Sequence, residues 1–434
     1  MTAATWIGGA SSRWPVVPIR RVCRLGTGHT PDRTKPEYWE DCNVPWVTVA
    51  DIHGLDGSGL APLMDTEQKV SELGLANSAA VLHPTETVMV SRTASIGFAC
   101  RIGRPMATTQ AFIAWTPGPE VDSRYLLLVV KAMKSEFDRL AHGSTHLTIY
   151  MPDIEGLKMP LPPLETQRAI ADTLDVETSR LDALIDKKRR MVRLLEESFS
   201  SWVFAEVTGR EAGQQQPSTL AWVDWIPSAW RSVPLRYAAR LGTGHTPSRT
   251  HPEYWVDCNV PWISLFDVGA MRDPFTEVTS TTKQRISDLG LANSSAVLHA
   301  AGTVVLSRTA SVGFATIMGN AMAVSQHFVT WTCGEDLLPE YLLYVLRAMR
   351  QEWESLQVGT TNVTVFMPDL YAVRIPLPPL MEQEQIVARI RRRRESVRQL
   401  VSALESQVSL LVEHRQAIIT AAVTGEIDVP WAAA

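Results

Sequence analysis

The spacing of apolar residues predicts two kinds of structure along the chain. In the first stretch of about 135 residues, short β-branched runs such as 44–49 and 87–90 are bounded by turn residues, which is typical of short strands. One stretch differs, because apolar residues recur at steps of four and three from Leu126 to Leu140. This periodicity predicts one helix whose apolar stripe faces the core.

From residue 165 to about 207, the apolar residues keep a helical period without any Gly or Pro. They recur at steps of three, four and seven, at Ile170, Leu174, Leu181, Leu184, Met191, Leu195 and Trp202. The pattern predicts a long helix with a narrow apolar seam, about 65 Å in length at about 1.5 Å per residue. A second stretch repeats it, at Ile386, Ile390, Val397, Leu400, Leu404, Leu411 and Ile418. Because neither helix can bury its seam alone, we expect the two to pack against each other.

The whole chain is duplicated. Residues 25–46 and 241–262 are identical at 19 of 22 positions, which sets an offset of 216 residues. The same offset places SRTASIGFA (91–99) on SRTASVGFA (307–315), and MPDIEGLKMPLPPL (151–164) on MPDLYAVRIPLPPL (367–380). One offset across separated blocks predicts two units of the same fold. A period this long indicates tandem domains and excludes a solenoid.

Composition narrows the class of protein. The 434 residues suffice for two or three domains, and 45% apolar with 20% charged residues excludes general disorder. A net charge of −5 argues against a protein that coats nucleic acid by bulk positive charge. The five cysteines form no C-x-x-C pair, which favours reduced thiols over a disulfide framework or a zinc site. No stretch has the pattern of a signal peptide or a membrane span, so we expect a cytoplasmic protein.

Positive charge is nevertheless concentrated locally. The stretch 13–35 carries six arginine and lysine residues against one acid, Asp32, and the matching stretch 231–251 carries four arginines and no acid. Such faces suit contacts with phosphate groups, with threonine hydroxyls as neutral donors. Ordinary solvated surface is the alternative. The basic runs 186–190 and 391–394 lie on the long helices, and we expect solvated helix faces there, with contact to DNA or a partner subunit as the alternative.

Loops that differ between the two units are candidates for reading different ligands. Residues 53–58 differ from 269–274, and those around 142–148 differ from 358–364, although drift of exposed loops predicts the same pattern. Arg92 and Arg308 lie in SRTAS turns, where an arginine can reach a guanine edge or a phosphate or can brace the turn. The candidate DNA-binding residues are Arg24, Thr27, His29, Thr30, Arg33, Lys35, His53, Arg92, Thr145, His146, Arg240, Thr243, His245, Thr246, Arg249, Arg272, Arg308, Thr361 and Asn362.

Motifs for catalysis are missing from the sequence. It contains no G-x-x-x-x-G-K-[ST], H-E-x-x-H or G-x-S-x-G pattern. Asp153, Glu155 and Lys158 look like the carboxylate–lysine set of a nuclease, but the second unit has Tyr371 and Arg374 in place of the last two. A segment that leads into a helix is the better interpretation. We therefore predict no catalytic residues and no metal site. The duplicated histidines, His29/His245 and His83/His299, lack partners at ligand spacing and are expected to be structural or hydrogen-bonding.

Three duplicated motifs together resemble the specificity subunit of type I restriction-modification enzymes. They are the G-x-T-P…Y-W…P-W run from Gly28 to Trp46, the S-R-x-x-S-I/V-G turn, and P-L-P-P-L-x-E-Q-x-x-I. The last motif is complete at 376–386, whereas Thr166 replaces its Glu in the first unit. Ala94 and Ala310 stand where such proteins often carry Gly. The resemblance covers essentially the whole chain.

The resemblance implies an α+β protein with pseudo-twofold symmetry. Two similar mixed α/β target-recognition domains, 13–150 and 223–366, would be separated by a pair of long antiparallel coiled-coil helices within two helical spacers, 151–209 and 367–428. Residues 210–222 would form a linker. Each domain would read one half of a bipartite target in double-stranded DNA, and a rod of about 65 Å corresponds to at most about nineteen base pairs.

It also implies a non-catalytic chain that binds no cofactor of its own. The helices would dock two methyltransferase (adenine-N6) subunits, and motor-nuclease restriction subunits would join the complex. S-adenosylmethionine, ATP and Mg²⁺ would bind to those partner subunits, and no membrane would be involved. Two other functions stay open: a stand-alone nuclease with an unrecognised metal site, and a scaffold that binds proteins and not DNA.

Overall fold

The computed structural model describes residues 5–7, 13–53, 60–93, 95–143, 147–359 and 363–428. The chain divides into two compact units: unit 1 contains residues 1–189 and 405–434, and unit 2 contains residues 190–404. The long helices α7 (Leu164–Thr208) and α13 (Leu380–Thr424) each contribute a segment to both units. Both helices have 45 residues, which confirms the prediction of two long helices.

Unit 1 is built on a four-stranded antiparallel sheet. Its strand order is β2-β8-β5-β6, and a smaller sheet has the order β4-β3-β7, in which β3 and β7 are parallel. The strands are β2 (Cys23–Thr27), β8 (Phe112–Pro117), β5 (Val88–Ser91), β6 (Ala99–Arg101), β4 (Lys69–Val70), β3 (Val44–Val47) and β7 (Ala107–Thr108). The predicted short strands at 44–49 and 87–90 are confirmed in outline.

The two faces of this sheet belong to different cores, as the alternation of side chains along a strand requires. Val88 and Val90 pack with Trp115 against helix α4 (Ser123–Ala132), whereas Met89 packs with Phe112 on the opposite side. The first core also takes in residues of α7 and of the C-terminal part of α13. The domain of unit 1 is therefore packed directly onto both long helices.

The helix predicted from Leu126 to Leu140 is in fact two helices. Helix α4 ends at Ala132, and α5 (Lys134–Leu140) begins after Met133, whose ψ of 9° lies outside helical geometry. The second unit has the same break at Met349, between α10 (Pro339–Ala348) and α11 (Arg350–Ser355). The apolar period continues across the break because both helices face the same core. The sequence pattern alone therefore did not reveal the bend.

Unit 2 repeats the topology of unit 1, which confirms the duplication. Its sheets have the orders β13-β20-β17-β18-β15 and β16-β14-β19. The extra strand β15 pairs with β18 where unit 1 has a single bridge between Leu63 and Ile102. The strands are β13 (Ala239–Thr243), β20 (Phe328–Cys333), β17 (Val304–Ser307), β18 (Ala315–Met318), β15 (Val278–Thr279), β16 (Gln284–Ile286), β14 (Val260–Ile263) and β19 (Ala323–Val324).

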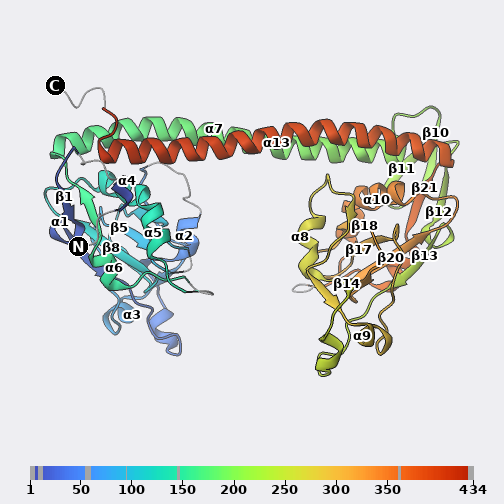
Figure 1. Ribbon diagram of the computed structural model, residues 1–434, viewed down its shortest axis with the longest axis horizontal. Helices are drawn as coiled ribbons and strands as arrows, with labels where there is room; N and C mark the ends of the chain where they lie inside the picture. Colours follow the sequence, from blue (N-terminus) through green and yellow to red (C-terminus); the bar gives the residue numbers. More distant parts are fainter. Residues whose placement is uncertain are drawn as a thin grey trace. The chain divides into compact units, whose positions relative to one another are not determined.

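Within each unit, α7 and α13 lie side by side and run antiparallel (Figure 1). In unit 1, Asp182 forms an ion pair with Arg415, and Lys188, further along α7, donates to Gln407, which is earlier on α13. In unit 2, Glu206 pairs with Arg389 at 2.7 Å. The opposite order of the partners defines the antiparallel packing, and apolar residues of both helices share each unit's core. The prediction that the two helices pack together is confirmed within each unit, but Leu184, Met191 and Leu400, which were assigned to the seams, are exposed.

The remaining elements are short. Strand β1 (Val16–Pro18) pairs with β9 (Lys158–Pro160), and β12 (Arg231–Pro234) pairs with β21 (Arg374–Leu377). The interval 210–222, expected to be a linker, contains β10 (Gln215–Leu220), which pairs with β11 (Val223–Pro227). The short helices and 3-10 turns are η1 (Thr5–Ile7), α1 (Ile19–Val22), η2 (Pro36–Trp39), α2 (Val49–His53), α3 (Glu72–Ala76), α6 (Met151–Glu155), η3 (Leu235–Tyr237), η4 (Pro252–Trp255), η5 (Leu265–Asp267), α8 (Val268–Met271), α9 (Asp288–Ala292) and α12 (Met367–Ala372). Among the described residues, no helix combines the length and the apolar character that crossing a bilayer requires.

Candidate nucleic-acid interface

Three segments of unit 1 meet through a chain of polar contacts. The Thr30 hydroxyl donates to the side-chain oxygen of Gln110 at 2.7 Å, and the Arg92 Nε donates to the Gln110 backbone carbonyl at 3.2 Å. Arg92 also exchanges hydrogen bonds with Ile149, at the end of the 142–148 segment. The end of β2, the turn after β7, the SRTAS turn and the 142–148 segment are therefore adjacent. We call Thr30, Gln110 and Arg92 the polar trio of unit 1.

Unit 2 contains the same arrangement, made of Thr246, Gln326 and Arg308. The Thr246 hydroxyl donates to the Gln326 side chain at 2.5 Å, and the Arg308 Nε donates to the Gln326 carbonyl at 3.2 Å. Arg308 donates to the Val365 carbonyl at 3.1 Å. The geometry is thus repeated at the offset of the sequence duplication.

Gln110 and Gln326 are members of the site that the sequence reasoning missed. They lie in TTQAF and VSQHF, at the same offset of 216 residues as the other motifs. The flanking residues differ, so the match between the two units is short at this point. The signal that identifies the pair is an identical polar residue at the offset of the duplication.

The sequence left open whether Arg92 and Arg308 brace the SRTAS turn, and their contacts show that they do. Both guanidinium groups bond to two backbone carbonyls, so both arginines brace the SRTAS turn. Burial lowers the pKa of Arg308 from its ordinary value, which fits a partly enclosed group. A DNA contact by either arginine stays a prediction.

The loop after β2 carries cations that are held by aromatic rings. The Arg33 guanidinium lies 5.2 Å from the centre of the Trp39 ring, and the Lys35 ammonium lies 5.0 Å from that of Tyr38. In unit 2, Arg249 lies 4.7 Å from the centre of the Trp255 ring. Cation–π contacts of this kind fix a long side chain while its charge stays exposed. The loop therefore presents ordered positive charge.

The other candidates in the two basic stretches are at the surface. Arg24, Thr27 and His29 are exposed along and just after β2, and Arg240, Thr243 and His245 are exposed at the matching places of unit 2. Arg272 is also exposed; it donates to the Ser311 hydroxyl at 3.3 Å and stacks on Phe314, so it joins the SRTAS turn of unit 2. Five candidates, the His53 side chain and residues Thr145, His146, Thr361 and Asn362, lie outside the described residues.

His83 and His299 are buried in their units, in keeping with a structural role. Burial lowers the pKa of each imidazole, the backbone of Thr27 or Thr243 raises it in part, and the charge of Arg24 or Arg240 lowers it further. An ideal Cβ on Gly26 would lie 2.7 Å from the His83 ring, so the ring fills the space that this glycine leaves. Both histidines are therefore enclosed in the neutral form.

We expect the stability of the protein to fall as the pH drops below about 6.5, the ordinary histidine pKa. There the unfolded chain binds protons that the native His83 and His299 do not, so the free energy of unfolding decreases with acidification. Urea unfolding between about pH 5 and pH 7 measures this slope. His83→Gln with His299→Gln should flatten it, and the same change at the exposed His29 and His245 should not. An unchanged slope in the first variant would contradict the assignment.

The expected solvated face is observed for most of the run 391–394, since Arg391, Arg392 and Arg393 are exposed, but not for Arg394. Arg391 and Arg394 were expected on a solvated face, but both form ion pairs with Glu277, and the Arg394 side chain is only 20% exposed. The charges of the run 391–394 alone do not reveal this pairing, because Glu277 is 114 residues away from Arg391 in the sequence. Arg393 is exposed and lies 5.9 Å from the centre of the Trp202 ring.

Nothing in the described part of the chain brings three or more His, Cys, Asp or Glu side chains together as a metal site would require. Asp153 and Glu155 lie in the short helix α6, and Lys158 begins β9. The segment thus leads from the domain toward α7. The prediction that this segment leads into a helix agrees with this geometry.

Comparison with known proteins assigns the chain to a family. The family described as the type I restriction modification DNA specificity domain matches residues 11–191 and 227–398, one match for each half of the chain. The chain therefore belongs to this family.

Relatives of known class extend the assignment. The chain is 27% identical over 204 residues to the type I restriction enzyme MjaIX specificity subunit of Methanocaldococcus jannaschii, covering 46% of this chain and 45% of that subunit. It is 21% identical over 316 residues to the MjaVIII specificity subunit of the same organism, covering 71% of each. The first alignment spans less than half of the relative.

A solved structure supports the fold. A chain in a structure that describes the complex assembly and conformational transition of the type I R-M system matches with a TM-score of 0.60 and 20% identity. The match covers 95% of this chain and 98% of that chain. The predicted α+β fold, with two repeated mixed domains and long helices, is confirmed.

Proposed function

We propose that this chain is the DNA-reading subunit of a type I restriction-modification complex. Each unit contacts one half of a bipartite target in double-stranded DNA. The observation that carries the proposal is the duplicated interface: the same polar trio and the same aromatic-held cation occur in both units, next to loops whose residues differ. Shared cations suit phosphates, which are the same in every sequence, and differing loops suit base edges, which are not.

The chain positions DNA and leaves the bond-making to other subunits. Two methyltransferase subunits would dock on it and methylate adenine N6 with S-adenosylmethionine, and restriction subunits would use ATP and Mg²⁺. The family assignment and the absence of known catalytic motifs from the sequence support this division. The purified chain with Mg²⁺ should neither cut nor methylate DNA, whereas addition of the methyltransferase subunits should produce methylation. Cleavage by the chain alone would favour a nuclease, and a lack of DNA binding with or without the other subunits would favour a protein scaffold.

Exchange of one domain tests the proposal directly. Replacement of residues 13–150 by the corresponding domain of another specificity subunit should change one half of the methylated sequence and leave the other half intact. The measurement is the map of methylated adenines in a cell that also expresses the methyltransferase subunits. The reciprocal exchange of 223–366 is the matched control and should change the other half. A simultaneous change of both halves in either variant would contradict separate reading by the two units.

A further inference from the structure

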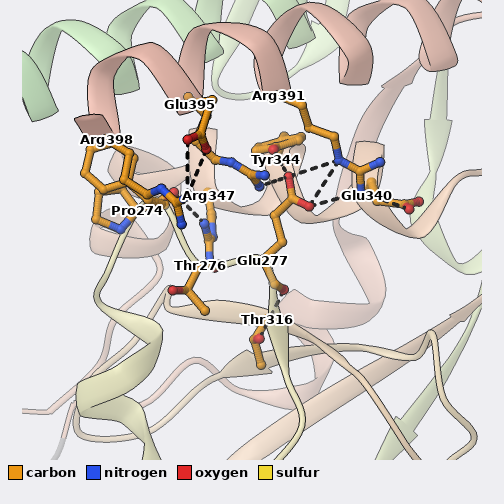
Figure 2. A network of polar contacts seen from close by, with 12 residues as sticks. Pro274, Thr276, Glu277, Thr316, Glu340, Tyr344, Arg347, Arg391, Glu395 and Arg398 are labelled. Carbon is orange, nitrogen blue, oxygen red and sulfur yellow. Dashed lines mark hydrogen bonds and ion pairs between the residues drawn. The ribbon is translucent and has the colours of Figure 1, made fainter. Parts of the chain in front are cut away.

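A cluster of polar side chains joins the domain of unit 2 to helix α13 (Figure 2). At its centre is Glu277, whose side chain is 8% exposed and accepts from Arg391 at 3.0 Å. Glu277 also forms an ion pair with Arg394 and accepts a hydrogen bond from the Tyr344 hydroxyl. Burial raises the pKa of Glu277, but the bonds and charges of these three partners outweigh burial and hold the pKa below its ordinary value. The carboxylate is thus charged and fully partnered.

The acids that pair with Arg391 and Arg394 lie on the domain, whereas Glu395 of α13 pairs with Arg398 of the same helix. Glu340, on α10, adds a second acid, 3.2 Å from Arg391. The neighbouring Arg347 is occupied by backbone carbonyls, including those of Pro274 at 2.9 Å and Thr276 at 2.6 Å. Arg347 therefore stabilises the loop before β15, and Glu277 and Glu340 form their ion pairs with arginines of α13.

In unit 1 the ion pair between α4 and the long helix has the opposite polarity, and its acid, Asp172, lies one turn before the counterpart of Arg391. At the offset of 216 residues, Arg124 replaces Glu340 and Asp175 replaces Arg391, while Ala61 and Thr178 replace Glu277 and Arg394. Arg124, on α4, forms an ion pair at 2.6 Å with Asp172, one helical turn before Asp175. Asp175 itself accepts from the Leu60 backbone N–H at 3.3 Å. Arg124 thus lies on the domain and its partner Asp172 on the long helix, while Arg168 of α7 lies 3.9 Å from Asp122, the residue before α4.

We propose that these reversed charges match each recognition domain to its own segment of the long helices. A unit 2 domain placed on the helices of unit 1 would bring Glu277 and Glu340 toward Asp172 and Asp175, where Asp175 and Thr178 stand in place of Arg391 and Arg394. Removal of one partner of a buried pair is costly, and a like charge in its place costs more. A domain can therefore move between the two positions only if the helix residues that face it change as well. This inference does not depend on DNA binding.

Four substitutions in the full-length chain test the proposal. Glu277→Ala with Glu340→Arg gives the domain side of unit 2 the residue types of unit 1, and Arg391→Asp with Arg394→Thr does so for the helix side. Each pair alone leaves like charges facing each other and should lower the melting temperature by about 5 °C or more. The variant with all four changes places the introduced arginine at position 340 opposite the introduced aspartate at position 391. It should therefore be more stable than the sum of the two losses predicts.

The effect of charge pairing is isolated when the loss of stability in the fourfold variant is compared with the sum of the losses in the two double variants. The Tyr344 hydroxyl loses its acceptor both in the domain-side variant and in the fourfold variant, so this cost cancels. Arg350 and Glu354 form an exposed i,i+4 pair at 3.2 Å and supply the control. Reversal of the charge at each of these two positions, first singly and then together, should give losses of stability that are nearly additive. Additive losses at the four positions as well would overturn the proposal.

Discussion

Alanine at Gly28 is expected to disrupt the candidate interface of unit 1, and alanine at Gly244 that of unit 2. An ideal Cβ on Gly28 would collide with the backbone carbonyl oxygen of Thr108 and lie 2.5 Å from that of Thr109. On Gly244 it would collide with the Val324 carbonyl. Backbone atoms cannot swing away as a side-chain tip can, so the loop that carries Thr30 or Thr246 must move. We expect a loss of about 3 kcal/mol in the free energy of unfolding, at the upper end for overpacking.

Hydrogen exchange at single backbone amides tests this prediction. The His29 N–H donates to the Thr108 carbonyl at 3.0 Å, and the His245 N–H donates to Val324 at 3.0 Å. These amides should lose their protection from hydrogen exchange in the corresponding variant. Gly269→Ala in α8 is the matched control, because nothing lies within 4 Å of its ideal Cβ. If Gly244→Ala were as stable as Gly269→Ala, the close approach of the two backbones would not be essential.

The parts of the fold that could be predicted are those where one local pattern determines the structure. The seams of α7 and α13 keep a helical period over many turns, so both helices were predicted, and the ends of α7 lie within about one residue of the predicted ones. The duplication predicted a common topology because identical motifs recur at one offset. The bends at Met133 and Met349 could not be predicted, since the apolar stripe continues through them. Strand β10 was missed because its polar residues have no alternation.

The sequence predicted which residues of the candidate site lie at the surface, but it did not predict the contacts that these residues make. The exposed Arg24, Thr27 and His29 follow from their place in a basic stretch. The bracing role of Arg92 depends on carbonyls of Gln110 and Ile149, which only the fold brings near. The ion pairs of Arg391 and Arg394 with Glu277 could not be predicted for the same reason. Long-range pairing decides the role of such residues, and a single sequence does not contain it.

Gln167 and Gln383 explain why a glutamine recurs at the start of each long helix. The Gln383 side chain is completely buried. It accepts from the Leu338 N–H at 2.9 Å and donates to the carbonyls of Asp336 at 2.8 Å and Pro378 at 2.9 Å. Gln167 makes the same three bonds in unit 1, to Asp122, Glu120 and Pro162. The amide thus joins the start of the long helix to the segment that leads into α4 or α10, even though Thr166 differs from Glu382.

Gln383→Ala is therefore expected to destabilise unit 2 severely. It removes the partner of the buried Pro378 carbonyl and of two part-buried groups, the Leu338 N–H and the Asp336 carbonyl, so the total loss should be about 3 kcal/mol. For a unit of this size, the melting temperature should fall by about 6–12 °C. Gln383→Glu keeps the shape but loses both amide donors, so it separates lost bonds from lost volume and should also be strongly destabilised. Gln385→Ala, two residues along on the exposed face, should change little. Equal melting temperatures for the variants at 383 and 385 would show that the three bonds do not hold the domain to its helix.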